Sequence, residues 1–230
     1  MKKNQAFAFV TLIVFGLTVN FAPLIFLSNE AQAAATPQFQ QIITAGTLLT
    51  DIRDNSRVTV ASPTVAMSAI NASFGCASTT GTFGSSTQRI YVDNPSAANN
   101  GWTLSLAATG GATSYWTSAS STFDFNDPTT AGCTDGADAD TLSGQMSINP
   151  SGSTITAEYT SGSSILGISK GSNSAFNQGT TDSITIMSAA NTASSTWRGY
   201  QTGIGVVQTI PAEQPAQSYT LGMTLTVTAL

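Results

Sequence analysis

The chain of 230 residues holds 7 Lys and Arg against 12 Asp and Glu, contains no histidine, and carries a formal net charge of −5. Nucleic-acid binding needs clustered positive charge, so this balance excludes nucleic acid as an expected partner. The lack of histidine excludes Ser-His-Asp and Cys-His catalysis as usually built, together with most zinc and copper sites.

The N-terminus predicts a secretory signal peptide, residues 1–33. Lys2 and Lys3 precede an apolar run over residues 6–27, and small residues in an A-x-A arrangement follow. These are the three parts of a signal peptide, and we expect cleavage after Ala33, with Ala35 as the alternative. An uncleaved membrane anchor is the rival interpretation, because the run is about long enough to span a bilayer. After cleavage we expect no membrane span and a secreted protein at the extracellular cell surface.

Residues 34–56 stand apart as an N-terminal strand or arm. Phe39, Gln41 and Ile43 alternate along the chain, which is the period of a β-strand. Two interpretations stay open: the first strand of its own domain, or an arm that adds to the sheet of a neighbouring molecule. In the second, the assembly contacts come from four apolar residues, Phe39, Ile42, Ile43 and Leu48.

Period-two alternation runs through residues 57–230 and predicts β-strands. Trp102, Leu104 and Leu106 share one face of a strand, and residues 219–227 form the clearest strand. Weaker strands are expected at residues 57–61, 64–70, 88–93, 144–148, 154–159, 165–168, 183–187 and 203–209. Short strands with one apolar face and one Thr/Ser face predict an all-β fold, a single antiparallel β-sandwich of Ig-like or jelly-roll-like form.

The two cysteines, Cys76 and Cys133, predict one disulfide bond, because an even count in an exported chain favours pairing. Such a bond closes a loop of about 57 residues and stabilises the fold by about 3–4 kcal/mol through chain entropy. The alternative is a pair of buried thiols.

One segment is unusually acidic for this chain and suggests a calcium site. Ca²⁺ takes six to eight oxygen ligands from a flexible loop, and its role here would be to pin a long loop to the sandwich. The alternative is an exposed Asp/Gly turn beside the disulfide. The candidate metal ligands are Asp124, Asp127, Asp135, Asp138 and Asp140.

The tryptophans are candidates for carbohydrate stacking. Trp102 is expected in the core, because it shares a face with two leucines. Trp116, in a polar setting, is the candidate ligand-binding residue, and Trp197 begins either a small aromatic patch or a loop that packs on the sandwich edge. Glu158 and Glu213 are the candidates for a paired-carboxylate glycosidase, but nothing fixes a pair, and no enzymatic activity is expected.

Residues 101–106 (Gly-Trp-Thr-Leu-Ser-Leu), following Ile90-Tyr91-Val92-Asp93-Asn94, resemble the first signature of bacterial WxL-type cell-surface domains. The closing block at residues 208–221 and the Thr-rich last strand are similar to their C-terminal motif, with Tyr219 in place of the family's Trp. This resemblance covers roughly residues 57–230 and implies a secreted β-sandwich on a cell surface. Residues 45–48 (Ala-Gly-Thr-Leu) resemble the mature N-terminus of camelysin-type biofilm fibre subunits, which implies polymerisation by lending an N-terminal strand.

The sequence therefore predicts a secreted, non-enzymatic cell-surface structural protein, wall-associated or self-assembling through β-strand addition. Its expected partner is a homo-polymer or a cell-wall glycan. The alternative function is a carbohydrate- or cell-wall-binding module, which an exposed aromatic row would favour. A glycan-active enzyme is a third possibility, and it would need two carboxylates facing each other across a cleft.

Overall fold

The structure is a computed structural model that describes residues 40–97, 100–136, 140–158, 164–193 and 195–230. The expected signal peptide, Phe39 and Asp138 lie outside the described residues. The chain divides into two units, Met1–Ile42 and Ile43–Leu230, and the strands of the described residues belong to the second. No helix in the described part of the chain is long and apolar enough to cross a membrane.

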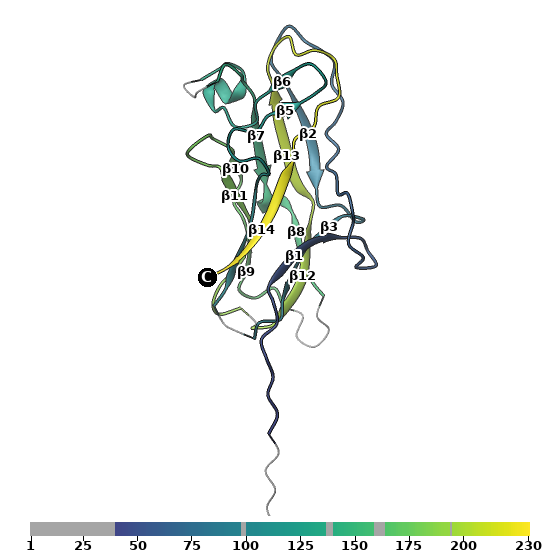
Figure 1. The fold of residues 1–230 in the computed structure, drawn as a ribbon, viewed down its shortest axis with the longest axis vertical. Coiled ribbons are helices and arrows are strands. Elements are labelled where there is room, and N and C mark those ends of the chain that lie inside the picture. The colour runs from purple at the N-terminus through teal and green to yellow at the C-terminus, as the bar shows by residue number, and fades with distance from the viewer. Residues whose placement is uncertain (1–39, 98–99, 137–139, 159–163, 194) are drawn as a thin grey trace, which may run out of the picture. The chain divides into compact units, whose positions relative to one another are not determined.

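The second unit is an antiparallel β-sandwich, which confirms the predicted fold class (Figure 1). Its strands are β1 (Leu49–Arg53), β2 (Ala77–Phe83), β3 (Arg89–Asn94), β4 (Trp102–Ala108), β5 (Trp116–Thr117), β6 (Thr122–Phe123), β7 (Gln145–Asn149), β8 (Thr154–Ala157), β9 (Ile168–Lys170), β10 (Ser174–Ala175), β11 (Ser183–Ala189), β12 (Trp197–Thr202), β13 (Ile204–Ile210) and β14 (Met223–Ala229). Two short 3-10 turns, η1 (Thr129–Gly132) and η2 (Pro150–Gly152), interrupt them.

The first layer consists of two four-stranded sheets that continue into each other. Their orders are β1-β3-β12-β8 and β10-β7-β13-β2, and the chain passes between them from β2 to β3, from β7 to β8 and from β12 to β13. The antiparallel register holds on both sides of the break, with Phe83 opposite Ile204 and Ile90 opposite Gln201. Gly203 lies at the break with φ of 80°, a conformation that glycine adopts without steric cost. The two sheets therefore act as one bent layer.

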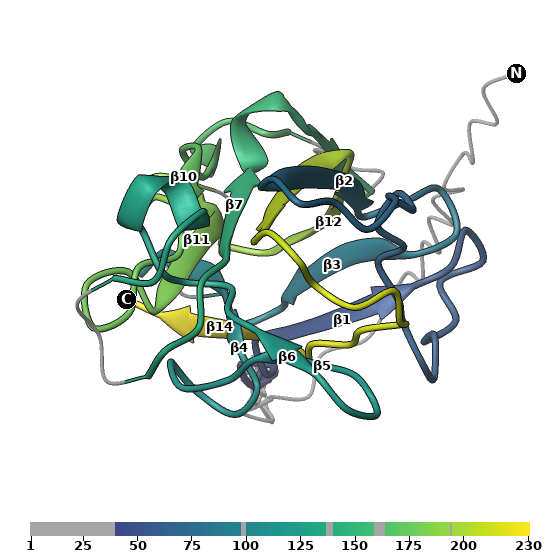
Figure 2. The same cartoon turned by 90° about the horizontal axis from the view of Figure 1, so that it is seen from above.

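The second layer is the sheet β14-β4-β11-β9, which packs on the first through the hydrophobic core. Seen from above, β4 and β14 lie on one side and β2, β3 and β12 on the other (Figure 2). Trp102, Leu104 and Leu106 of β4 are 1%, 0% and 4% exposed, so the predicted apolar face of this strand is confirmed as core. Burial of such side chains is the main favourable term in folding.

Three of the expected strands are wrong, and the one expected at residues 219–227 is found at Met223–Ala229. Residues 165–167 include a turn and form no strand, and β9 begins only at Ile168. Residues 57–61 and 64–70 each contribute only an isolated bridge, Thr59 to Arg53 and Met67 to Gly81. Val58 is 61% exposed and Ile70 is 40% exposed, so these segments lack the buried face that would hold a full strand in place.

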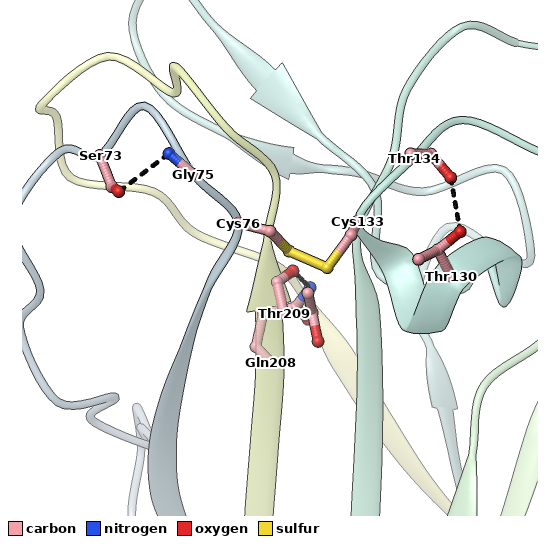
Figure 3. The surroundings of a disulfide bond; sticks show 8 residues. All are labelled: Ser73, Gly75, Cys76, Thr130, Cys133, Thr134, Gln208 and Thr209. Carbon is pink, nitrogen blue, oxygen red and sulfur yellow. Dashed lines mark hydrogen bonds between the residues drawn. A yellow bond between two sulfur atoms is a disulfide. The ribbon is translucent and has the colours of Figure 1, made fainter.

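The predicted disulfide between Cys76 and Cys133 is confirmed, with Sγ–Sγ at 2.10 Å and Cα–Cα at 5.5 Å (Figure 3). Cys76 directly precedes β2, and Cys133 caps the end of η1. The bond therefore links the start of the edge strand β2 to the acidic loop, residues 124–140, which carries the candidate metal ligands.

Candidate assembly site

The last strand of the sandwich, β14, presents an incompletely covered apolar face. Leu225 lies opposite Leu106 of β4, and Val227 lies opposite Leu104. The two β4 residues are buried, whereas Leu225, Val227 and Met223 of β14 are only half-buried. Among the described residues, β14 has a strand neighbour on one side only. The core therefore ends at β14 with its inward face partly open.

An apolar groove runs beside this face, between β14 and the edge of the first layer, with a cavity volume of about 670 Å³. Its floor consists of core side chains from both layers: Phe83, Leu106, Met146, Ile148 and Val206. Its walls are residues 219–225 on one side and residues 63–67 on the other, and β1 closes one end. An exposed opening onto core residues is a feature of binding surfaces rather than of closed sandwiches.

The wall opposite β14 is a strap, residues 63–73, that lies loosely against β2. Its main-chain links to β2 include the Met67–Gly81 bridge and the bond from Ser68 N–H to Thr80 O at 2.7 Å. A Cβ atom at Gly81 would lie 2.6 Å from Met67 Sδ and 3.1 Å from Ala66 O, so a larger residue would displace the Met67 side chain from its place on β2. The strap thus occupies the place next to β2 without forming a strand there.

Trp116 lies where the groove meets a second cavity that runs on along the strap, since it lines both. The Trp116 ring stacks on Phe123 with the ring centroids 5.8 Å apart, and Phe123 in turn meets Tyr219 edge-on at 5.0 Å. Trp116 Nε1 donates a hydrogen bond to Gln208 Oε1 at 2.8 Å. The residue predicted to bind a ligand is therefore a half-buried part of the groove wall, with one face and its N–H already engaged.

The N-terminal arm, residues 34–48, leads into β1. Ile43 is 88% exposed and Ile42 is 72% exposed, whereas Leu48 packs against the core of its own sandwich. Gly46 N–H donates to Pro95 O at 3.1 Å, and a Cβ atom at Gly46 would clash with the Pro95 ring. The chain is therefore fixed to the sandwich from Gly46 onward, whereas Ile42 and Ile43 before that point are exposed.

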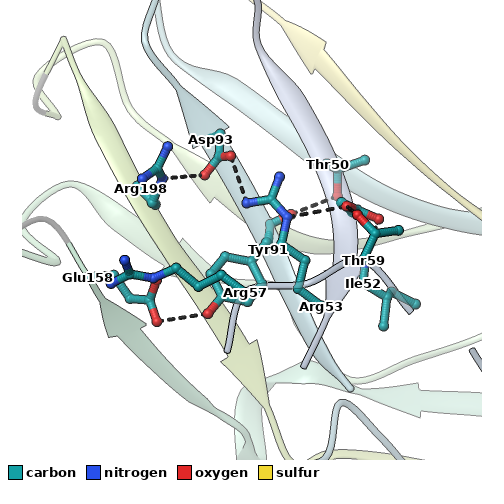
Figure 4. Close-up of polar contacts among 10 residues, drawn as sticks. Thr50, Ile52, Arg53, Arg57, Thr59, Tyr91, Asp93, Glu158 and Arg198 are labelled. Atoms are coloured by element: carbon teal, nitrogen blue, oxygen red, sulfur yellow. Dashed lines mark hydrogen bonds and ion pairs between the residues drawn. The ribbon is translucent and has the colours of Figure 1, made fainter. Parts of the chain in front are cut away.

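An ion-pair network on the outer face of the first layer fixes β1, the root of the arm (Figure 4). Asp93 of β3 accepts from Arg53 of β1 and from Arg198 of β12, both at 2.8 Å. Glu158 accepts from Arg57 Nε at 2.8 Å and from the Tyr91 hydroxyl at 2.7 Å. Burial opposes the charge of Arg53, but its bonds to Asp93 and Asp51 outweigh this effect and raise its pKa. The network joins β1, β3 and β12 into one unit.

Tyr91 gives this network a measurable pH dependence. Burial and the hydrogen bond to Glu158 both raise the pKa of Tyr91 above its ordinary value of about 10. The unfolded chain therefore loses the Tyr91 proton at a lower pH than the folded chain does. The stability that the Tyr91 hydroxyl contributes is complete below about pH 10 and is lost as pH rises through the higher folded-state pKa. We expect the free energy of unfolding to fall with pH above about 10 more steeply in the wild type than in Tyr91→Phe.

Urea unfolding between neutral and alkaline pH checks this prediction. Tyr219→Phe is the matched control, because it removes a phenol whose hydroxyl bonds only locally, to Pro215 O. If the free energy of unfolding falls with pH equally steeply in the wild type and in Tyr91→Phe, the Tyr91 hydroxyl does not have this role.

The acidic loop has a buried part and a surface part. Asp124 and Asp127 are 0% and 1% exposed, and Asp127 Oδ1 accepts from Thr129 N–H at 2.8 Å. Asp140 Oδ1 accepts from Leu142 N–H at 2.7 Å, Asp135 lies in the turn after Cys133, and Asp138 is outside the described residues. Within the described part of the chain, no three His, Cys, Asp or Glu side chains group to hold a metal ion. Calcium binding stays a prediction from the sequence.

Sequence reasoning missed the network around Asp93 and assigned Glu158 to a candidate catalytic pair instead. Glu158 belongs to the network, whereas Glu213 lies in the turn after β13, where its N–H donates to Ser73 O. Trp197, interpreted as a patch or a loop, begins the central strand β12 and is 4% exposed. The alternation of Arg89, Tyr91 and Asp93 along one strand was the available signal for a polar sheet face.

The geometry defines a class of protein: an antiparallel β-sandwich, braced by a disulfide and an ion-pair network, with an open groove and an exposed apolar arm. Comparisons with protein-family models, curated proteins and solved structures gave no match to this chain. The resemblance to WxL-type and camelysin-type proteins therefore stays a prediction from the sequence motifs.

Proposed function

We propose that this is an exported, non-enzymatic structural protein of the cell surface that assembles with copies of itself through β-strand addition. The observation that carries the proposal is the exposed apolar arm, in which Ile42 and Ile43 are 72% and 88% exposed. Neighbouring exposed isoleucines on an uncharged segment favour a partner that covers them.

The rest of the sandwich suits a subunit that lends a strand. β1 follows the arm directly and is held by the ion pairs of Arg53, so force on the arm passes into the sheet rather than unravelling the chain. Strand addition supplies main-chain hydrogen bonds along the whole segment, and alternate side chains enter pockets. The Cys76–Cys133 bond suits an oxidising compartment outside the cytosol, which supports export.

Retention at a cell wall would use the WxL-like motifs around Trp102 and Tyr219. Trp102 is buried in the core, and Tyr219 packs on Phe123 at the groove. Because Trp102 is buried, a glycan could contact only Tyr219 of these two residues. We therefore rank glycan binding second to self-assembly.

The proposal is tested by removing the arm. A chain that starts at Gly46 is expected to stay monomeric at all concentrations, whereas the mature chain from Ala34 forms concentration-dependent oligomers or fibres. Its melting temperature should change little, because the described residues removed are exposed. Light scattering with negative-stain microscopy measures assembly, and calorimetry measures the melting temperature.

A pair of substitutions separates apolar contact from chain length. Ile42→Lys with Ile43→Lys should abolish assembly, whereas Gln40→Lys with Gln41→Lys adds the same charge without removing an apolar side chain and should weaken it less. A mature chain that stays monomeric, or oligomers that survive loss of the arm, would refute the proposed function.

A further inference from the structure

We propose that the groove beside β14 is the acceptor site, and that residues 34–45 of a second copy lie in it as an added strand. This inference rests on the proposed function and names the surface that receives the arm. The added strand would cover Met223 and Leu225, the half-buried β14 residues that line the groove, and would pair with the edge of β14 that has no strand neighbour among the described residues.

The open side of the sandwich lies where the strap, rather than a strand, runs beside β2. Beside β3, the first layer is completed by β1, which also lies next to β14. Beside β2, which continues the same line, the strap supplies one isolated bridge in place of a strand. A strand that pairs with β14 would lie between β14 and the strap, and would help to complete the core there as β1 does at the other end.

The lining of the groove selects an uncharged, apolar segment. Asp51 is its only charged lining residue, and its carboxylate already accepts from Arg53 Nε and Thr59 Oγ1. A charged side chain placed over this apolar floor would lose its hydration without gaining a partner. Residues 34–50 contain no charged residue, and they carry the exposed isoleucines.

The occupant comes from a second copy because the arm joins β1 at its first residue, whereas the groove runs from the middle of β1 past the other end of that strand. The arm leaves the sandwich at Gly46, beside Pro95 at the end of β3. The groove begins at Thr50–Ile52 and at Gly84–Gln88, before the start of β3. To fill its own groove, the arm would have to reverse direction and pass back along β1. A subunit that lends its arm therefore keeps its groove free for another copy.

This arrangement predicts the form of the assembly. Donor and acceptor are different surfaces, so the contact is head-to-tail, and a head-to-tail contact grows into an open filament unless its rotation closes a ring. Each added subunit would present one new groove and consume one arm.

Cysteine cross-linking tests the acceptor. One set of full mature chains carries Ile42→Cys or Ile43→Cys, which point to opposite faces of an extended segment. The other set carries Met223→Cys, Leu225→Cys or Val227→Cys, three same-face positions that cover the registers of an added strand. The two sets are mixed, assembled, oxidised and analysed by non-reducing electrophoresis and peptide mass mapping. Ser169→Cys, exposed on β9 at the opposite edge of the same sheet, is the matched control.

We expect at least one arm–β14 pair to yield on the order of ten times more cross-linked dimer than the Ser169→Cys control. If the chains assemble but all six arm–β14 pairs give no more cross-linked dimer than the control, the acceptor site is wrong, although assembly through the arm is not. A mature chain that forms no oligomers would refute the proposed function as well.

A second measurement does not depend on added cysteines. A synthetic peptide of residues 34–45 is titrated into the chain that starts at Gly46. Because Trp116 lines the groove, peptide binding should shift its fluorescence, and Trp116→Phe should abolish the shift while binding persists by calorimetry. No heat of binding up to millimolar peptide would overturn the inference.

Discussion

Replacing both cysteines, by Cys76→Ser with Cys133→Ser, is expected to lower the free energy of unfolding by about 4 kcal/mol. The bond spans a sequence separation of 57 residues, and an unfolded chain without it gains the entropy of that open loop. For a domain of this size the loss corresponds to a fall in melting temperature on the order of 10 °C.

The local consequence should fall on the groove wall. Cys76 fixes the point where the strap ends and β2 begins, and the strap itself is held to β2 by few main-chain bonds. Urea unfolding and hydrogen exchange of the chain that starts at Gly46, oxidised and reduced, measure both effects. Reduction of the wild type should reproduce the double variant. A change below about 1 kcal/mol would show that the disulfide is not a main source of stability.

The elements predicted best are those in which one face is continuously apolar. The sequence predicts β4 at its true position from Trp102, Leu104 and Leu106, because the inward residues are large and apolar and the outward ones are Thr, Ser and Ala. The Cys76–Cys133 bond was equally accessible, since the chain offers only one pair. In both cases the residue types alone carry the signal, without knowledge of which segments become neighbours in space.

The strands that were missed have inward residues that are not apolar. In β12 the inward Gly199 and Gln201 are buried, and Gln201 bonds to Ser153 Oγ at 2.6 Å. In β2 the inward positions include Thr79, which bonds to the strap, and Gly81, which makes room for it. Their burial follows from partners distant in the sequence, so periodicity alone does not reveal them.

The candidate site was half predictable for the same reason. The exposed arm follows from Ile42 and Ile43 in an uncharged segment, which the sequence displays. The groove does not, because the segment at residues 219–227 shows a complete alternating strand, with no sign that Leu225 lacks a neighbour on one side. Whether an alternating face is covered depends on how many strands the layer opposite contains.

Leu106 and Leu225 offer the sharpest test of that difference, because they are the same residue type and lie directly opposite each other on β4 and β14. Leu106→Ala is expected to cost about 3 kcal/mol of unfolding free energy in the chain that starts at Gly46, since its side chain is only 4% exposed and its loss leaves a cavity beneath the groove. Leu225→Ala should cost only about 1 kcal/mol there, because its side chain is half-buried and water already reaches it.

The order should reverse when assembly is measured. In the mature chain from Ala34, Leu225→Ala should raise the concentration needed for assembly about tenfold, because the incoming strand would bury this side chain against its own and complete the core around it. Leu106→Ala should raise that concentration much less wherever the subunit remains folded, since its side chain is already 4% exposed in the monomer and gains little further burial on the groove floor. Equal costs in the monomer would mean that the inward face of β14 is covered before any partner arrives, and that the arm is received elsewhere.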